Sequence, residues 1–150
     1  MMRFKFCVIS IFLLLSAWGS AFAGDINAFA EKTLGDFKNN NYEALYAEMS
    51  QAAKTAMPYN GMVDFFQEEK EILGKLQRYD KLDNMQQVTS YGLTTILRYA
   101  AYFEKTGAII VLTIVEENGK PACQSLHIDS LVFAKPEIQE RLKKFTPREK

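Results

Sequence analysis

The feature that most constrains the fold is a change of hydrophobic period at Gly74. Before this glycine, apolar residues recur every three or four positions, as on one face of an amphipathic helix; after it, they mostly alternate with polar residues, as along a strand. Glycine is typical of a helix end, because it adopts the left-handed conformation at no steric cost. We therefore expect helices followed by an antiparallel sheet, which is an α+β fold.

The segment before Gly74 is expected to form three helices. The first ends at the asparagines of residues 39–41, and Pro58-Tyr59-Asn60-Gly61 is expected to form a loop before the third. Phe66 lies on the apolar side of the third helix, whereas Glu68, Glu69 and Glu71 are expected on a solvated side. The expected ranges are 26–37, 42–49 with a further turn or two in 50–57, and 62–73.

The segment after Gly74 is expected to form strands joined by tight turns. Asn118-Gly119 is a strong hairpin signal, because both residues tolerate positive φ. Lys105-Thr106-Gly107 suits a three-residue loop with its glycine in the left-handed position. The expected strands are 76–82, 85–91, 93–104, 108–117 and 122–129.

These two turns predict a register, and the register predicts a polar row. It sets Tyr99 opposite Thr113 and Thr113 opposite Gln124, on an inner face that is otherwise mostly apolar. The row can be core polar groups that satisfy one another and a buried water. Alternatively, Tyr99, Thr113 and Gln124 form the polar end of a ligand pocket with Phe66 as its lid.

The same register predicts an apolar stripe on the outer face of the sheet. Its members are Tyr102, Ile110, Leu112 and Ile114, and a soluble monomer rarely leaves such a patch bare. Either sheet-to-sheet homodimerisation or the C-terminal helix is expected to cover it.

The stretch CQSLHIDS, residues 123–130, contains the residue types of a thiol nucleophile site but not the spacing. Along a strand Cys123 and His127 lie about 13 Å apart, whereas a base must come within about 3 Å of the group it deprotonates. We therefore expect no catalytic residue here. With one histidine and no glycine-rich phosphate loop, we also expect no metal site and no cofactor.

The N-terminal 23 residues have the pattern of a secretory signal peptide. Arg3 and Lys5 precede an apolar run, and residues 21–23 form a small-x-small cleavage site after Ala23. Cleavage implies a secreted or periplasmic protein with no membrane insertion afterwards. The remaining 127 residues carry a net charge of about −2 and no basic stripe, which argues against nucleic acid as a partner.

The remaining chain is expected to form one domain and a short tail. Residues 24–134 form the α+β domain. Residues 135–150 begin with a proline near a helix start, followed by Ile138, Leu142 and Phe145 at helical steps, which predicts a short amphipathic helix.

The chain resembles the nuclear transport factor 2-like superfamily, whose cystatin-like cone is a curved sheet wrapped around a long helix. The resemblance covers residues 29–128 and is closest to a small secreted bacterial branch of uncharacterised function. It is carried by the stretches FKNNNYEALYAEMS, EILGKLQRYDKL and TTILRYAAYFEKTGAIIVLTIVEENGK. Enzymes of the superfamily, such as ketosteroid isomerase and scytalone dehydratase, place acidic or histidine side chains inside the cone.

The resemblance and the expected faces favour a non-catalytic module. The expected inner face has no Asp, Glu or His on its last three strands. We therefore expect a small apolar ligand or a peptide to bind in the cone. Two alternatives stay open: an assembly protein that pairs through its outer face, and an enzyme whose acid or base, Asp80 or Asp83, comes from an earlier strand.

Overall fold

The computed structural model describes the backbone of residues 18–131 and the side chains of residues 26–131. This part of the chain is an α+β structure, as predicted from the change of period at Gly74. The predicted C-terminal helix lies outside the described residues, as does most of the predicted signal peptide. The helices are α2 (Trp18–Lys38), α3 (Tyr42–Ala47), α4 (Gln51–Ala56) and α5 (Tyr59–Leu73); the strands are β1 (Leu76–Thr89), β2 (Gly92–Phe103), β3 (Gly107–Glu117) and β4 (Lys120–Asp129).

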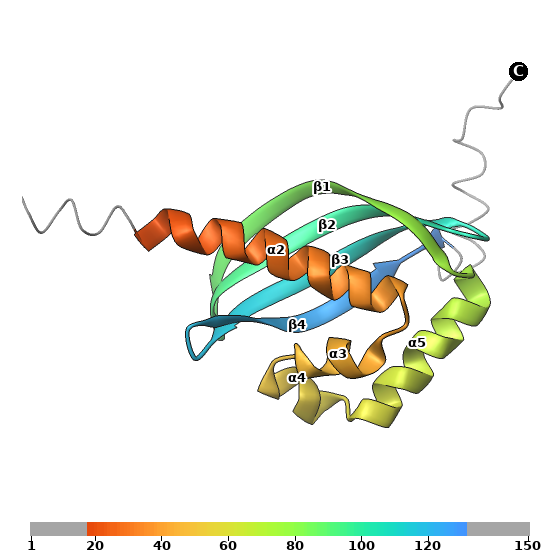
Figure 1. Ribbon diagram of the computed structural model, residues 1–150, viewed down its shortest axis with the longest axis horizontal. Coiled ribbons are helices and arrows are strands. Elements are labelled where there is room, and N and C mark those ends of the chain that lie inside the picture. The colour runs from red at the N-terminus through yellow and green to blue at the C-terminus, as the bar shows by residue number, and fades with distance from the viewer. Residues whose placement is uncertain (1–17, 132–150) are drawn as a thin grey trace, which may run out of the picture.

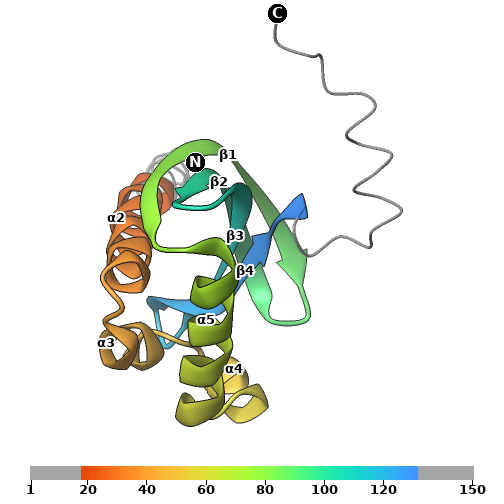
Figure 2. The same cartoon turned by 90° about the vertical axis from the view of Figure 1, so that its right-hand side faces the viewer.

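The strands form one open, curved antiparallel sheet in the order β1-β2-β3-β4. The long helix α2 runs across the concave face of the sheet (Figure 1). The helices α3, α4 and α5 lie beside and below α2, on the same side of the sheet (Figure 2). The helices therefore cover one face of the sheet, the arrangement expected from the sequence.

The concave face and the helices enclose a filled core. Fully buried side chains from β2 and β3 pack against the apolar stripe of α2 and against α5, and the interior of the cone is closed by aliphatic and aromatic groups. The largest of these side chains are Tyr99, Leu34, Leu45, Met62, Leu73, Leu97, Ile110, Leu112 and Ile114.

The predicted hairpin turn at Asn118-Gly119 and the predicted helix end at Gly74 both form. Asn118 and Gly119 have φ of 53° and 73°, as the hairpin prediction requires. Gly74 ends α5 with φ of 83°, and its backbone N–H donates to the Lys70 carbonyl at 2.8 Å. A Cβ on Gly74 would lie 2.7 Å from the Cβ of Glu104, so this position requires glycine for space as well as for conformation.

Two element boundaries differ from the prediction. Residues 59–61 belong to α5 rather than to a loop, because Pro58 is the N-cap, where its missing N–H costs nothing. The first two expected strands are one strand, β1, in which a bulge around Leu82 takes up the irregularity that suggested a break.

The predicted three-residue loop at Gly107 is wrong, and this error exchanges the faces of β3. The turn consists of Glu104 and Lys105, because Phe103 N–H donates to the Thr106 carbonyl at 2.9 Å. Tyr99 consequently lies opposite Ile110 instead of Thr113, a shift of three positions. An odd shift moves every side chain of β3 to the other face.

The shorter turn is caused by hydrogen bonds to a segment that is distant in the sequence, residues 73–75. Glu104 N–H donates to the Lys75 carbonyl and Lys105 N–H to the Leu73 carbonyl, both at 3.0 Å. The turn is therefore docked on the end of α5, which satisfies donors that a free hairpin loop would leave to water.

Candidate functional site

The predicted polar row does not form. Tyr99 lies on the concave face, where burial raises its pKa to about 12. Thr113 lies on the outer face, opposite Ile96 and Ser125. Gln124 is the extra residue of a bulge in β4. The three side chains are thus on different parts of the sheet, and the predicted ligand pocket built on them is wrong.

Gln124 has a structural contact instead. Its side-chain oxygen accepts a hydrogen bond from Ser50 Oγ at 2.7 Å, and Ser50 also caps α4 by accepting from Ala53 N–H at 3.0 Å. The backbones of Ser50 and Cys123 are hydrogen-bonded at 2.8 Å. These bonds fix the connection between α3 and α4 to the edge of β4.

The predicted outer apolar stripe is also wrong. Ile110, Leu112 and Ile114 are fully buried beneath the helices, because the register places their side chains on the concave face. Only Tyr102 is on the outer face, where the Arg78 guanidinium lies 4.3 Å from its ring centre. The outer face of β1 and β2 carries ion pairs, between Arg78 and Asp80 and between Arg98 and Asp83.

The bulge in β4 separates the members of the CQSLHIDS stretch. Cys123 is buried and pairs with Ile114, and burial raises the pKa of its thiol to about 12, so it is a neutral thiol. His127 is exposed and lies opposite Val111 on the outer face. The described residues contain no group of three His, Cys, Asp or Glu side chains that could hold a metal ion.

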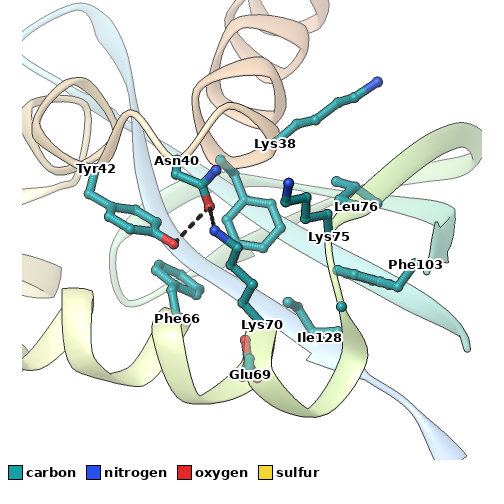
Figure 3. A pocket seen from close by; sticks show the side chains of 12 residues that line it. Lys38, Asn40, Tyr42, Phe66, Glu69, Lys70, Lys75, Leu76, Phe103 and Ile128 are labelled. Atoms are coloured by element: carbon teal, nitrogen blue, oxygen red, sulfur yellow. Dashed lines mark hydrogen bonds between the residues drawn. The ribbon is translucent and has the colours of Figure 1, made fainter. Parts of the chain in front are cut away.

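The candidate site is a small cavity where the end of α2 meets α5 and the start of β1 (Figure 3). Its volume is about 20 Å³, enough for one water molecule. The walls are apolar side chains from five elements, and the rim is polar. The wall residues are Phe37, Phe66, Leu76, Phe103 and Ile128; the polar residues are Lys38, Asn40, Tyr42, Glu69, Lys70 and Lys75.

Glu69 is the unusual group of this cavity. The residue is 9% exposed, and among the described residues its Oε2 is the buried side-chain oxygen that has no hydrogen-bond partner. Loss of hydration raises the pKa of its carboxyl to about 7. At neutral pH the group is therefore poised between the neutral acid and the carboxylate.

The position of Glu69 follows from the helical repeat of α5. The buried residues of this helix are Met62, Phe66, Glu69 and Leu73, which follow one another at steps of four, three and four. The flanking residues Glu68 and Glu71 predict a solvated side for Glu69, and this prediction is wrong. The spacing of Glu69 from Phe66 and Leu73 is the signal that could have identified it.

The rim is held by hydrogen bonds that converge on Asn40. This residue has φ of 57°, and its side-chain oxygen accepts from Tyr42 OH at 3.2 Å and from Lys70 Nζ at 3.1 Å (Figure 3). Behind the rim, Phe66 packs edge-on against Phe37 and stacks on Tyr42. Phe66 is thus a buried wall of the cavity and not the predicted lid.

Comparisons with known proteins give a fold but no family. No family model and no curated protein matches the sequence. Among solved structures, the chain is similar to Aln2 from a Streptomyces species, with a TM-score of 0.55 and 9% sequence identity over 82% of this chain and 96% of that one. At this identity the similarity shows the α+β fold alone. In the part of the chain that the structure describes, no helix is long and apolar enough to cross a membrane.

Proposed function

We propose that this protein is a secreted, non-catalytic binding module of the nuclear transport factor 2-like superfamily, and that its ligand site is the cavity at Glu69. The observation that carries the proposal is the Glu69 carboxyl, which is buried, has an oxygen without a protein partner and lines a cavity with apolar walls and a polar rim. A buried polar group without a partner costs about 1–3 kcal/mol. A group retained at such a cost is a candidate for binding something else.

The membership in this superfamily is supported by the order and placement of the elements. A long helix lies in the concave face of a curved antiparallel sheet, and the chain is similar in fold to Aln2 over most of both lengths. The secreted location is supported by the sequence pattern that ends at Ala23. Cleavage there would leave Ile26, a buried residue of α2, in the mature protein.

Binding is favoured over catalysis by what surrounds Glu69. The other ionisable groups at the cavity are lysines and Tyr42, and the strands contribute only apolar residues to it. The aspartates considered as catalytic groups, Asp80 and Asp83, lie on the outer face in ion pairs. An assembly role through the outer face is not favoured, because three of the four residues of the predicted apolar stripe are buried on the concave face.

The cavity is small because surface side chains close it. A ligand larger than water requires Asn40 and Lys70 to move, and both are side chains at the protein surface. Such side chains change rotamer within nanoseconds at little cost. The apolar walls behind them can then receive a compact ligand.

An NMR titration tests this proposal. Benzyl alcohol, a compact neutral probe, is added to the isotope-labelled secreted form, and native mass spectrometry of protein purified from its own envelope fraction reports any retained ligand. We expect shift changes confined to cavity residues such as Leu76, Phe103 and Ile128. Glu69→Gln should change the probe affinity, whereas the matched control Glu68→Gln, one residue along the same helix, should not. Shift changes scattered over the sheet, or none, would contradict the site.

A further inference from the structure

Apart from the buried Glu69, the charged residues that line the cavity are lysines. Lys38 comes from the end of α2, Lys70 from α5 and Lys75 from the connection to β1, and all three line the cavity (Figure 3). None of these amines forms an ion pair with a carboxylate of the described residues. The amine of Lys70 donates to the neutral side chain of Asn40.

Two carboxylates in this region, those of Glu104 and Asp36, already accept hydrogen bonds from other groups. Glu104 accepts the backbone N–H of Lys75 at 2.9 Å and the side-chain amide of Gln77 at 3.3 Å. Asp36 pairs with Lys32 and accepts from Asn41. The rim therefore presents the amines of Lys70 and Lys75 beside a cavity whose one acid, Glu69, is buried, and the Lys38 side chain extends away from the cavity from the end of α2 (Figure 3).

We propose that the ligand of the Glu69 cavity is a compact apolar molecule with an anionic head group, which the lysines of the rim bind. This inference rests on the proposed function, since it names the ligand class of the same site. The cationic side chains of Lys70 and Lys75 at the mouth of a cavity with apolar walls complement a molecule that is negative at one end and apolar at the other.

The contacts of Asn40 indicate where the head group would lie. Its side-chain oxygen receives two donors, Tyr42 OH and Lys70 Nζ, one of them charged. An oxygen that accepts from a phenol and an ammonium occupies the place that an anionic oxygen of a ligand would take. An anion there would accept the same two hydrogen bonds and gain the attraction of Lys75.

Glu69 makes this binding depend on protons. The groups that face the cavity are Lys38 from α2, Tyr42 from α3, Lys70 on α5 and Lys75 after it; β1, β2 and β4 contribute only Leu76, Phe103 and Ile128. As a neutral acid, Glu69 can donate a hydrogen bond to the ligand, whereas an ionised Glu69 would repel an anion across a poorly hydrated cavity. The affinity for an anion should therefore fall as the pH rises through about 7.

Three probes of matched shape test the ligand class: benzoate, benzyl alcohol and benzylamine. They keep their charges between about pH 6 and pH 8, and NMR titration of the secreted form gives their affinities. We expect benzoate to bind most tightly and benzylamine most weakly. If only the protonated form of Glu69 binds, the affinity for benzoate should drop about tenfold between those pH values.

Two variants test which residues are responsible for benzoate binding and for its dependence on pH. Glu69→Gln keeps a neutral donor and should remove the pH dependence of benzoate binding. Lys70→Gln combined with Lys75→Gln should weaken benzoate but leave benzyl alcohol unchanged, whereas the control Lys120→Gln, on the β3–β4 hairpin, should alter neither. Tighter binding of benzylamine than of benzoate would overturn the anion assignment and keep the site. Stronger benzoate binding at high pH would overturn the role of protonated Glu69. Failure of all three probes to bind would overturn the proposed function itself.

Discussion

The β1–β2 hairpin has two halves that share strands and hydrogen-bond ladder but differ in burial. In the half next to α5, Leu97 is fully buried and Tyr99 packs edge-on against Tyr79. In the half toward the turn, Val88 is 83% exposed and Leu93 is 44% exposed. Burial in this half does not follow apolarity, since Thr94 and Thr95 are 3% and 2% exposed while Leu93 beside them is partly at the surface.

The half toward the turn, called here the uncovered half in contrast to the covered half next to α5, is held by polar contacts between its strands. The hydroxyls of Thr89 and Thr94 are 2.8 Å apart, and Gln86 donates to Thr95 at 3.4 Å. Such cross-strand pairs contribute about 0.2–1 kcal/mol each, less than the burial of a large apolar side chain. We therefore expect most of the stability to reside in the covered half.

The largest expected effect comes from the covered half of β2. Leu97→Ala should lower the free energy of unfolding by about 2–5 kcal/mol, because it leaves a cavity among fully packed neighbours. Chemical denaturation monitored by circular dichroism measures this change. A loss below about 1 kcal/mol would show that the core beneath α2 is loosely packed.

An intermediate effect is expected from the buried carboxyl of Glu69 in α5. Burial raises the pKa of Glu69 from its ordinary value of 4.5 to about 7, so the folded protein holds a proton that the unfolded chain releases. Stability from this group is complete below about pH 4.5 and is lost as the pH rises through about 7. Glu69→Gln should therefore match the wild type at pH 4 and exceed its stability by roughly 1–3 kcal/mol at pH 8.

The control for Glu69→Gln is again Glu68→Gln, because Glu68 is exposed on the same helix. It should leave the dependence of unfolding free energy on pH as in the wild type. Equal slopes for the wild type and Glu69→Gln would show that the Glu69 carboxyl is hydrated in solution.

The smallest effect is expected from the uncovered half. Leu93→Ala removes the same atoms from the same strand as Leu97→Ala, but Leu93 is partly exposed, so the loss of unfolding free energy should stay below about 1 kcal/mol. Denaturation under the same conditions makes the two variants a matched pair. Equal losses at Leu93 and Leu97 would mean that something covers the exposed half in solution.

Local features of the fold could be predicted from the sequence. The end of α5 at Gly74 and the hairpin at Asn118-Gly119 depend on backbone conformations that few residues tolerate. The apolar period of residues 26–37 likewise predicted a helix with one buried side, and Ile26, Ala30 and Leu34 in this range are all buried. These signals act over a few residues, so the chain itself contains them.

The candidate site could be predicted only in part. Phe66 was assigned to a ligand site and does line the cavity, although as a wall. Glu69 was missed because its two neighbours Glu68 and Glu71 suggested solvent, whereas its burial depends on the strands and on α2 closing over that side of α5. Asn40 and the rim lysines come from separate elements, and no local pattern brings them together.

The sequence by itself determined the change from helices to strands at Gly74 and the hairpin turn at Asn118-Gly119, because each depends on the conformational preferences of neighbouring residues. Only the tertiary structure decided the faces of β3 and β4. A turn of two residues, Glu104 and Lys105, replaces the expected loop because its backbone N–H groups find acceptors at the end of α5. A bulge at Gln124 then shifts β4, with Ser50 bonded to the side chain of that residue. In a strand, one residue of shift exchanges core for surface, so contacts between distant segments decided where Thr113, Ile110 and Leu112 lie.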